Sequence, residues 1–313
     1  MKILIIGASG FIGSNLSSFL SSLKYEVYCF VRKTSNLKKL NDAQKYYDQK
    51  NIPKIIFGDI KKNEELTSQF LKYKFDIVIN SAAYGVHFSH QDEQEAKYIN
   101  TNFCEQLINI CNRNSVKHLI HLGTGHEYGF HNEIINEKTS LNPVTLYGKT
   151  KAIGGKKILN LAKNMDMKFT YLRPFAIYGQ FQDEHMFMPL ILRSMQNNSL
   201  LQLSPGNQKR DYLHIDDFVA SIHKVIESEY LSRISLINIA YGESFSLKEI
   251  AKLAVSVLDI SDKSLQWGRL NYRGEENMNI LVSNNKAKIE LGWVPKIKIE
   301  SGIIKTYKML NND

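Results

Sequence analysis

The sequence predicts an α/β protein with a doubly wound parallel sheet and a smaller C-terminal lobe. Short apolar runs of β type alternate with segments of helical pattern along most of the 313 residues. These runs are continuously apolar, which is typical of strands buried on both faces of a parallel sheet. After Pro174 the pattern becomes irregular and the apolar runs become shorter. This change indicates a second lobe.

Seven apolar runs are expected to be strands, at residues 3–6, 26–31, 54–57, 75–80, 118–123, 169–173 and 236–240. Helical patterns occupy residues 11–22, 63–72, 93–112, 147–164, 216–228 and 246–258, with a last helix near 300–310. We expect residues 1–174 to form the sheet domain, with residues 214–240 returning to it. Residues 175–313 are expected to form the smaller lobe.

Composition argues against several classes of protein. Hydrophobic residues make up 43% of the chain, enough for a sizeable core, and the net charge is +9. Because the lysines are scattered, we expect a diffuse field that attracts an anionic ligand, or an ordinary solvated surface, and no nucleic-acid partner. No run approaches the roughly 18 apolar residues of a membrane span, and the N-terminal apolar run is too short for a signal peptide. Three cysteines without a CxxC pair indicate reduced thiols and a cytoplasmic protein.

A glycine-rich turn follows the first expected strand. Residues 7–13 read GASGFIG, a GxxGxxG pattern between a strand and a helix. Glycine permits a tight turn and close approach of the backbone to a pyrophosphate, and the helix start offers free N–H groups. The pattern predicts a dinucleotide site with Gly7, Gly10, Phe11, Ile12 and Gly13 at the cofactor.

The end of the second expected strand indicates which dinucleotide is bound. Proteins that bind NAD usually hold an acid there for the adenosine ribose, but this chain has Val31, Arg32 and Lys33. A guanidinium can pair with a 2′-phosphate, which a carboxylate would repel. We therefore predict NADP(H), with NAD(H) less favoured. The alternative is that Arg32 and Lys33 belong to an ordinary charged loop.

Further cofactor contacts are expected where the next strands end. Asp59, followed by Ile60, comes after the third strand and is placed to bind the adenine amino group. Ala82 and Ala83, in the run NSAAYG after the fourth strand, would lie along the cofactor. Pro174 is also expected at the cofactor.

Tyr147 and Lys151 form a candidate catalytic pair. They are four residues apart in LYGKTK, so they share one face of the expected helix. A lysine ammonium beside a phenol favours the phenolate, so we expect Lys151 to lower the pKa of Tyr147 and make it a proton donor or acceptor. Thr124 follows a central strand, at the edge where ligands of open α/β sheets bind, and its hydroxyl is placed to bond a substrate oxygen.

Taken together, these motifs resemble a known family. GxxGFIG, Thr124, the Tyr147-x-x-x-Lys151 pair, LRPFAIYG and RDYLHIDD are similar to the extended short-chain dehydrogenase/reductase family, and the similarity covers nearly the whole chain. Its members are NAD-dependent epimerases, dehydratases and reductases of nucleotide sugars. The resemblance implies a Rossmann-type fold, and hydride transfer at a sugar carbon with Thr124, Tyr147 and Lys151 as the catalytic residues. It also implies a nucleoside-diphosphate sugar bound by residues 175–313.

The resemblance implies further site residues. Asn100 looks like the family's helix asparagine that supports the site and the cofactor. Arg210 and Arg273 match arginines that contact the nucleotide diphosphate, for which bidentate charge-assisted bonds are suited; surface ion pairing is the alternative. Tyr84 is expected at the substrate.

The residues after Thr124 separate the reactions of the family. Dehydratases read Thr-Asp-Glu where this chain has Thr124, Gly125 and His126, so both acids of 4,6-dehydration are missing. GTGHEYG resembles the GSSSEYG of branches that include 4-keto-6-deoxy sugar reductases, and the C-terminal tail resembles those of CDP-abequose and CDP-paratose synthases. We predict an NADPH-dependent 4-ketoreductase that makes an activated deoxysugar for surface polysaccharide. The alternatives are a 4-epimerase, a dual epimerase/reductase and a non-catalytic dinucleotide-binding protein.

Other titratable residues receive more ordinary interpretations. His126 is interpreted as a pocket residue that bonds the sugar; the alternative is an acid/base for carbons beside the ketone. His185 lies near the place of the family's second catalytic group, one residue out of register. His87 and His90 are interpreted as loop residues, and no metal is expected. Asp216 and Asp217 are interpreted as a helix N-cap and a first-turn acid.

A homodimer is also expected. The helices near 96–112 and 147–164 carry more apolar residues than one core face needs, and the family resemblance implies that such helices pair between subunits.

Overall fold

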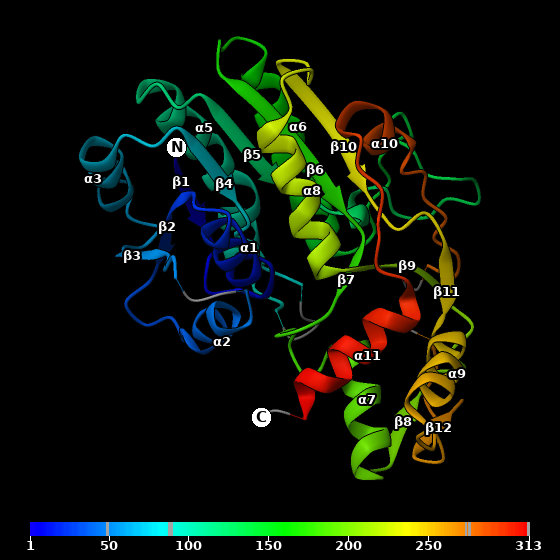
Figure 1. Cartoon of the computed structure of the whole chain (residues 1–313). Coiled ribbons are helices and arrows are strands. Elements are labelled where there is room, and N and C mark those ends of the chain that lie inside the picture. The colour runs from blue at the N-terminus through cyan, green and yellow to red at the C-terminus, as the bar shows by residue number, and fades with distance from the viewer. Residues whose placement is uncertain (48–49, 87–89, 273, 275–276, 312–313) are drawn as a thin grey trace. The chain divides into compact units, whose positions relative to one another are not determined.

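The structure of the chain is a computed structural model that describes residues 1–47, 50–86, 90–272, 274 and 277–311 (Figure 1). These described residues form two compact units. The first contains residues 1–129, 140–174 and 222–237, and the second contains residues 130–139, 175–221 and 238–313.

The strands of the larger sheet are β1 (Lys2–Ile6), β2 (Glu26–Val31), β3 (Lys54–Phe57), β4 (Ile77–Asn80), β5 (His118–Leu122), β6 (Lys168–Pro174) and β10 (Ile234–Ile239). The helices that alternate with them are α1 (Phe11–Ser22), α2 (Lys38–Tyr47), α3 (Asn63–Tyr73), α4 (Glu93–Lys97), α5 (Phe103–Arg113), α6 (Leu146–Ala162) and α8 (Ile215–Glu227). Two short elements are the π-helix η1 (Tyr98–Asn102) and the 3-10 helix η2 (Gly125–Glu127).

A parallel sheet is central to the first unit. Seven of the described strands form it, in the order β10-β6-β5-β4-β1-β2-β3, and neighbours from β6 to β3 pair in parallel. Because β1 lies between β4 and β2, the winding of the chain reverses at β1, and ligands of open α/β sheets bind beside such a reversal. The predicted Rossmann-type doubly wound sheet is confirmed.

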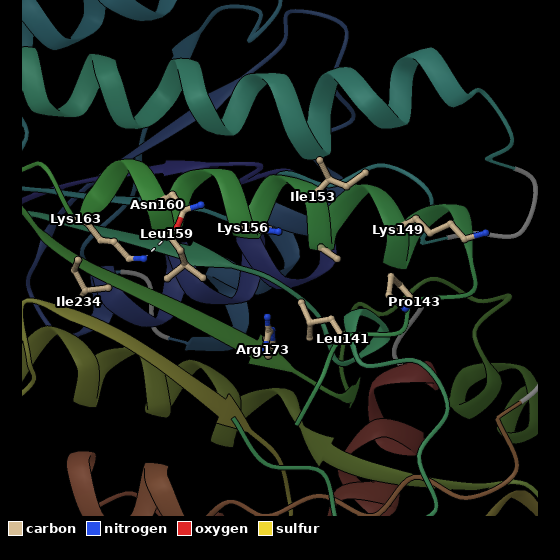
Figure 2. A pocket seen from close by; sticks show the side chains of 11 residues that line it. Leu141, Pro143, Lys149, Ile153, Lys156, Leu159, Asn160, Lys163, Arg173 and Ile234 are labelled. Carbon is tan, nitrogen blue, oxygen red and sulfur yellow. Dashed lines mark hydrogen bonds between the residues drawn. The ribbon is translucent and has the colours of Figure 1, made fainter. Parts of the chain in front are cut away.

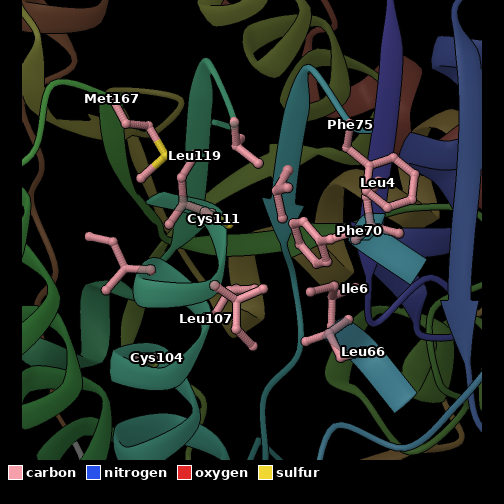
Figure 3. Packing of buried hydrophobic residues seen from close by; sticks show 14 of the residues in the cluster. Leu4, Ile6, Leu66, Phe70, Phe75, Cys104, Leu107, Cys111, Leu119 and Met167 are labelled. Atoms are coloured by element: carbon pink, nitrogen blue, oxygen red, sulfur yellow. The ribbon is translucent and has the colours of Figure 1, made fainter. Parts of the chain in front are cut away.

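The strand β1, inside the sheet, is buried on both faces. Leu4 and Ile6 of β1 belong to one buried cluster together with Leu66 of α3, Leu107 of α5 and residues of α6 (Figure 3). Ile3 and Ile5 of β1 are also fully buried, and they point to the opposite face because side chains alternate along a strand. Burial on both faces explains the continuous apolar runs of the sequence.

The second unit has its own core. Its strands are β7 (Ala176–Tyr178), β8 (Leu201–Leu203), β9 (Lys209–His214), β11 (Ser244–Ser246) and β12 (Leu265–Trp267), and its further helices are α7 (Phe187–Asn197), α9 (Leu247–Leu258), α10 (Asn285–Leu291) and α11 (Ile299–Leu310). The described strands pair as β11-β9-β7 and β12-β8. Ile191 of α7, Ile250 of α9 and Ile303 of α11 pack in one buried cluster with Tyr178.

One expected helix is interrupted. The sequence predicts a continuous helix over 93–112, whereas the structure has α4, then the π-helix η1, then α5. A π turn locally widens a helix and is frequent at functional sites. Here it contains Asn100.

Few of the described large apolar side chains on the expected dimer helices are exposed, although Ala152, Ile153 and Leu159 line a groove beside α6 (Figure 2). Within the described parts of α4, η1, α5 and α6, Ile153 is the one large hydrophobic side chain that is exposed, at 54%. The other large apolar residues of these helices are buried or half-buried inside the unit. The homodimer stays a prediction. Among the helices that the structure describes, none is long and apolar enough to cross a membrane.

Candidate active site

The glycine turn after β1 leaves no room for side chains. Gly7 has φ +83°, and a Cβ there would lie 2.7 Å from the backbone nitrogen of Ala82. A Cβ on Gly13 would lie 2.2 Å from the carbonyl oxygen of Gly7. The backbone of α1 therefore lies against Gly7, and Gly7 lies against the segment that follows β4, as a turn that receives a pyrophosphate requires.

The start of α1 has the properties of an anion site. No side chain in the described residues caps its N-terminus, and its first turn contains no acid. The first N–H groups of a helix lack acceptors within that helix, and the positive end of its dipole attracts negative charge. These features, together with the glycine turn, fit the diphosphate of a dinucleotide.

The end of β2 presents cations to solvent. Val31 is buried, whereas Arg32 and Lys33 are exposed. Asp59 follows β3, and its carboxylate accepts a hydrogen bond from the backbone of Lys61 at 2.9 Å. The backbone N–H of Asp59 donates to Glu65 at 2.9 Å, which helps to lower the pKa of that carboxyl. Ile60 packs against the core beside this loop.

Asn100 fixes the segment that follows β4. Its amide nitrogen donates to the carbonyl of Tyr84 at 2.7 Å and to Thr150 Oγ1 at 3.0 Å, while its amide oxygen accepts from the backbone N–H of Tyr84 at 3.0 Å. Asn100 thus ties the Tyr84 loop to α6. A Cβ on Gly85 would lie 3.3 Å from Cβ of Tyr147, so this loop passes directly beside Tyr147.

Thr124, Tyr147 and His126 lie together at the carboxyl end of β5. Tyr147 and Thr124 share a side-chain hydrogen bond. Thr124 also caps η2 by accepting from the backbone N–H of His126 at 3.3 Å. The exposed His126 ring packs edge-on to Tyr147, with ring centres 5.7 Å apart. The three side chains expected at the substrate in this region therefore meet at one point.

Lys151 does not lower the pKa of Tyr147 in this structure, so that expectation is wrong. The Lys151 side chain is 2% exposed, and its ammonium donates to the carbonyl oxygen of Leu122 at 2.8 Å. Burial lowers the pKa of Lys151. Burial also raises the pKa of Tyr147 above its ordinary range, and the hydrogen bond with Thr124 opposes that rise.

Glu127, for which the sequence predicts no role, anchors this end of β5. Its carboxylate is fully buried and accepts from the backbone N–H of Thr124, from the Tyr171 hydroxyl and from Arg173 Nε, each at 2.9 Å. The Arg173 guanidinium lies over the ring of Tyr128, 4.7 Å from its centre. The available signal was an acid and an arginine at the ends of two buried runs, in HEYG and LRPF.

Small residues let α6 approach this network. A Cβ on Gly148 would lie 2.5 Å from the carbonyl oxygen of His126, and one on Gly155 would lie 2.3 Å from the Tyr171 hydroxyl. A Cβ on Gly154 would lie 1.9 Å from the carbonyl oxygen of Asn100. These glycines allow α6 to carry Tyr147 and Lys151 directly against β5 and η1.

The second unit holds two of the other predicted site residues. Arg210 lies on β9 and donates to the carbonyls of Lys209 and Asn277, and His185 is exposed. Arg273 and His87 lie outside the described residues. His90 stacks on Tyr84 with ring centres 4.6 Å apart.

The interpretation of Asp216 or Asp217 as a helix N-cap is wrong. α8 begins at Ile215, so both acids lie inside its first turn. His214 precedes the helix, and its Nδ1 accepts from the backbone N–H of Asp216 at 3.2 Å. Asp217 accepts instead from the backbone N–H groups of residues 296 and 297.

The first unit therefore defines an α/β dinucleotide-binding fold with a threonine, a tyrosine and a lysine at the end of a central strand. The chain belongs to the NAD dependent epimerase/dehydratase family, whose model matches residues 3–240. It is similar to an uncharacterised UDP-glucose epimerase of Bacillus subtilis, with 28% identity over 97% of this chain and 96% of the relative.

Two further relatives bear on the reaction. CDP-abequose synthase of Salmonella muenchen is 27% identical over 46% of this chain and 48% of its own length. The crystal structure of UDP-glucuronic acid 4-epimerase from Bacillus cereus, in complex with UDP-glucuronic acid and NAD, is 26% identical with a TM-score of 0.87, over 100% of this chain and 99% of that one.

Proposed function

We propose that the protein is an NADP(H)-dependent reductase of the C4 ketone of a nucleoside-diphosphate 4-keto-6-deoxy sugar. The observation that carries the choice of a reductase is the exposed pair Arg32 and Lys33 at the end of β2, where an acid for the ribose of NAD would be expected. Two cations there favour a 2′-phosphate. A reductase consumes NADPH from solution, whereas an epimerase retains its dinucleotide, usually NAD.

In this proposal the residues at the end of β5 bind and protonate the sugar. A nicotinamide bound in the first unit would supply the hydride to C4. The Tyr147 hydroxyl donates a proton to the oxygen on C4 as its negative charge develops, and the Thr124 hydroxyl holds that oxygen. The Tyr147 phenol is protonated near neutral pH, as a proton donor must be, although its raised pKa makes it a weaker acid. Lys151 would hold the nicotinamide ribose.

The hydrogen bonds of Glu127 support the proposal of a reductase over a dehydratase. Gly125 and His126 stand where dehydratases carry two acids. Glu127 is the neighbouring acid, but both of its carboxylate oxygens are engaged, by Thr124 and Tyr171 on one side and by Arg173 on the other. A carboxylate held in this way is a positioning group rather than a proton carrier.

A 4-epimerase is the second candidate. It is favoured by two full-length relatives that are named as UDP-glucose epimerases. The edge-on contact of His126 with Tyr147 supports instead a dual epimerase/reductase, whose imidazole would exchange protons on a carbon beside C4. An enzyme with both activities would use the same residues.

The remaining assignments follow from the proposed reaction. The first unit would bind NADP(H) through Gly7, Gly10, Gly13 and the first turn of α1. The second unit would bind the nucleotide sugar, with Arg210 and Arg273 at its diphosphate. The product would be an activated deoxysugar for surface polysaccharide, made in the cytoplasm. The protein would form a homodimer through α5 and α6. Sedimentation at micromolar concentration tests this prediction.

The deciding experiment measures oxidation of NADPH, and separately of NADH, by the full chain with 4-keto-6-deoxy sugars of CDP, GDP, dTDP and UDP. We expect rapid loss of NADPH absorbance with one of these nucleotides and slow loss of NADH. Interconversion of intact UDP-hexoses without net oxidation of the dinucleotide would show that the protein is an epimerase and not a reductase. A parallel reaction in D₂O measures the exchange of a proton on a carbon beside C4. If His126 carries out that exchange, the His126→Gln variant should lose it.

A further inference from the structure

A chain of buried hydrogen bonds crosses the parallel sheet near the carboxyl ends of β4 and β5. Asn80 ends β4, and His121 lies beside it in register on β5. Both side chains belong to residues that are 1% exposed, and Asn80 Nδ2 lies 3.2 Å from His121 Nδ1. On the other side of the ring, His121 Nε2 lies 3.7 Å from Sγ of Cys104, which belongs to α5 (Figure 3). His121 therefore joins the sheet to a helix packed on it.

The atoms of this chain admit one arrangement of protons. The backbone N–H of Ala82 lies 3.1 Å from the amide oxygen of Asn80, and this contact orients the amide, because a backbone N–H can only donate. Asn80 Nδ2 then donates to His121 Nδ1, so the imidazole carries its proton on Nε2 and donates it to Cys104 Sγ. The Cys104 thiol donates to the carbonyl oxygen of Asn100 at 3.2 Å. Every donor in the chain thus points the same way, from Ala82 to Asn100.

The imidazole at the centre of the chain is neutral and fixed in orientation. Burial lowers the pKa of His121 well below its ordinary value, and the charge of Lys151 acts in the same direction. The His121 ring stacks on the ring of Tyr171 from β6, with centres 5.3 Å apart and planes 15° from parallel. Tyr171 in turn donates to Glu127. A neutral ring held in this way accepts on one side and donates on the other.

The two ends of the chain meet one short segment of backbone. The chain begins at the N–H of Ala82 and ends at the carbonyl of Asn100, whose side chain makes two hydrogen bonds to the backbone of Tyr84. Residues 82–84 are therefore held from both ends. This segment also borders the glycine turn, because a Cβ on Gly7 would lie 2.7 Å from the backbone nitrogen of Ala82.

We propose that His121 is a positioning residue for the dinucleotide, and that it acts by holding residues 82–84 in place through Asn80 on one side and Cys104 on the other. The inference rests on the proposed function in one respect, namely that residues 82–84 line the dinucleotide. It applies equally to a reductase and to an epimerase. His121 acts through its neighbours and is not itself a catalytic residue.

The first test is a nitrogen NMR spectrum of the free protein containing isotope-labelled histidine, with His121→Gln as the variant that identifies the His121 signals. We expect the pattern of a neutral imidazole that carries its proton on Nε2. This pattern should persist from neutral pH down to about pH 5, because burial disfavours the charged ring. A proton on Nδ1, or protonation near the ordinary pKa of histidine, would overturn the proposal.

The second test separates positioning from packing with three cysteine variants. Cys104→Ala removes the link between His121 and Asn100, whereas Cys104→Ser keeps a donor and an acceptor at the same place. Cys111→Ala is the matched control, because Cys111 is buried in the same cluster two turns further along α5 and lies outside the chain (Figure 3). Hydrogen exchange at residues 82–84 of the free protein should become about five- to tenfold faster in Cys104→Ala alone.

Binding of NADPH and of NADH, measured by fluorescence titration, completes the comparison. Both affinities should fall about fivefold in Cys104→Ala and stay within about twofold of native in Cys104→Ser and Cys111→Ala. Native exchange and affinity in Cys104→Ala, or an equal loss in Cys111→Ala, would overturn the proposal. If Cys104→Ala exchanges faster but the native protein binds neither dinucleotide, the proposed function fails, whereas the role of His121 in holding residues 82–84 is supported.

Discussion

The carboxyl ends of β5 and β2 carry the two halves of the proposed function, and they are built in opposite ways. At the end of β5, Thr124 is 5% exposed and Glu127 is fully buried, and hydrogen bonds join both to neighbouring strands and helices. At the end of β2, Arg32 and Lys33 are exposed. The reacting groups are thus held by the same bonds that hold the fold, whereas the groups that select the dinucleotide contribute little to folding. Substitutions at the two ends should separate accordingly.

The largest effect is expected from Tyr147→Phe. The change removes one hydroxyl, the proposed proton donor, so turnover should fall about a thousandfold. Binding of NADP(H), measured by fluorescence, should remain within about twofold of the native value, since a phenyl ring of the same shape remains. Tyr230→Phe, at a site that is 94% exposed, is the control and should leave turnover unchanged. A Tyr147→Phe variant with native turnover would show that another group donates the proton.

Glu127→Ala should affect both stability and turnover. It leaves the buried Arg173 without its carboxylate, and breaking such a pair costs about 3 to 5 kcal/mol of the free energy of unfolding. Urea denaturation measures this loss. Glu127→Gln keeps the size of the side chain, so the folded variant reports on positioning: kcat should fall while KM for the sugar changes less. Glu105→Gln, on the exposed face of α5, should change neither quantity appreciably.

The difference between the ends of β5 and β2 also explains which parts of the structure can be predicted from the sequence. The strands of the large sheet and the glycine turn are local patterns, because burial on both faces demands continuous apolar runs and the turn demands Gly7 and Gly13. The pair of Glu127 and Arg173 joins residues 46 apart in the chain, and no local pattern specifies such a partner. The direction of the pKa shift of Tyr147 was also missed, because it depends on how deeply α6 packs.

The second unit was harder to predict for a geometric reason. β7, β8, β11 and β12 each have three residues, too few to show a periodic pattern. α7 begins with FMPL, and a proline there is compatible with the first turn of a helix but resembles a break in sequence. In the first unit, α2 is also hard to predict. It buries only Leu40 and Ala43 among its described residues, so its apolar stripe is too narrow to recognise.

The double variant Arg32→Ala, Lys33→Ala should weaken binding of the dinucleotide without an appreciable loss of stability. Removal of two charge-assisted contacts, at roughly 1.5 kcal/mol each, should weaken binding of NADPH by about a hundredfold. NADH has no 2′-phosphate, so its affinity should change little, and the free energy of unfolding should stay within about 0.5 kcal/mol of the native value. Isothermal titration with both dinucleotides makes the comparison. An equal loss for NADH and NADPH would contradict the assignment of these cations to the 2′-phosphate.

A further expected effect is a sensitivity to acid that belongs to β5 and not to β2. His118 begins β5, is 5% exposed and lies 2.8 Å from Thr170 Oγ1 through its Nε2. Burial lowers its pKa to about 3, below the ordinary value of about 6.5 in the unfolded chain. The unfolded state therefore binds a proton that the folded state refuses, and the free energy of unfolding should fall as the pH drops below that ordinary value, by about 1.4 kcal/mol per pH unit for this one group. His118→Gln should flatten this dependence in urea denaturations between neutral and mildly acidic pH, whereas the exposed His185→Gln should leave it unchanged. An equally steep dependence in His118→Gln would place the acid sensitivity elsewhere, for instance at the buried His121, whose pKa is also lowered by burial.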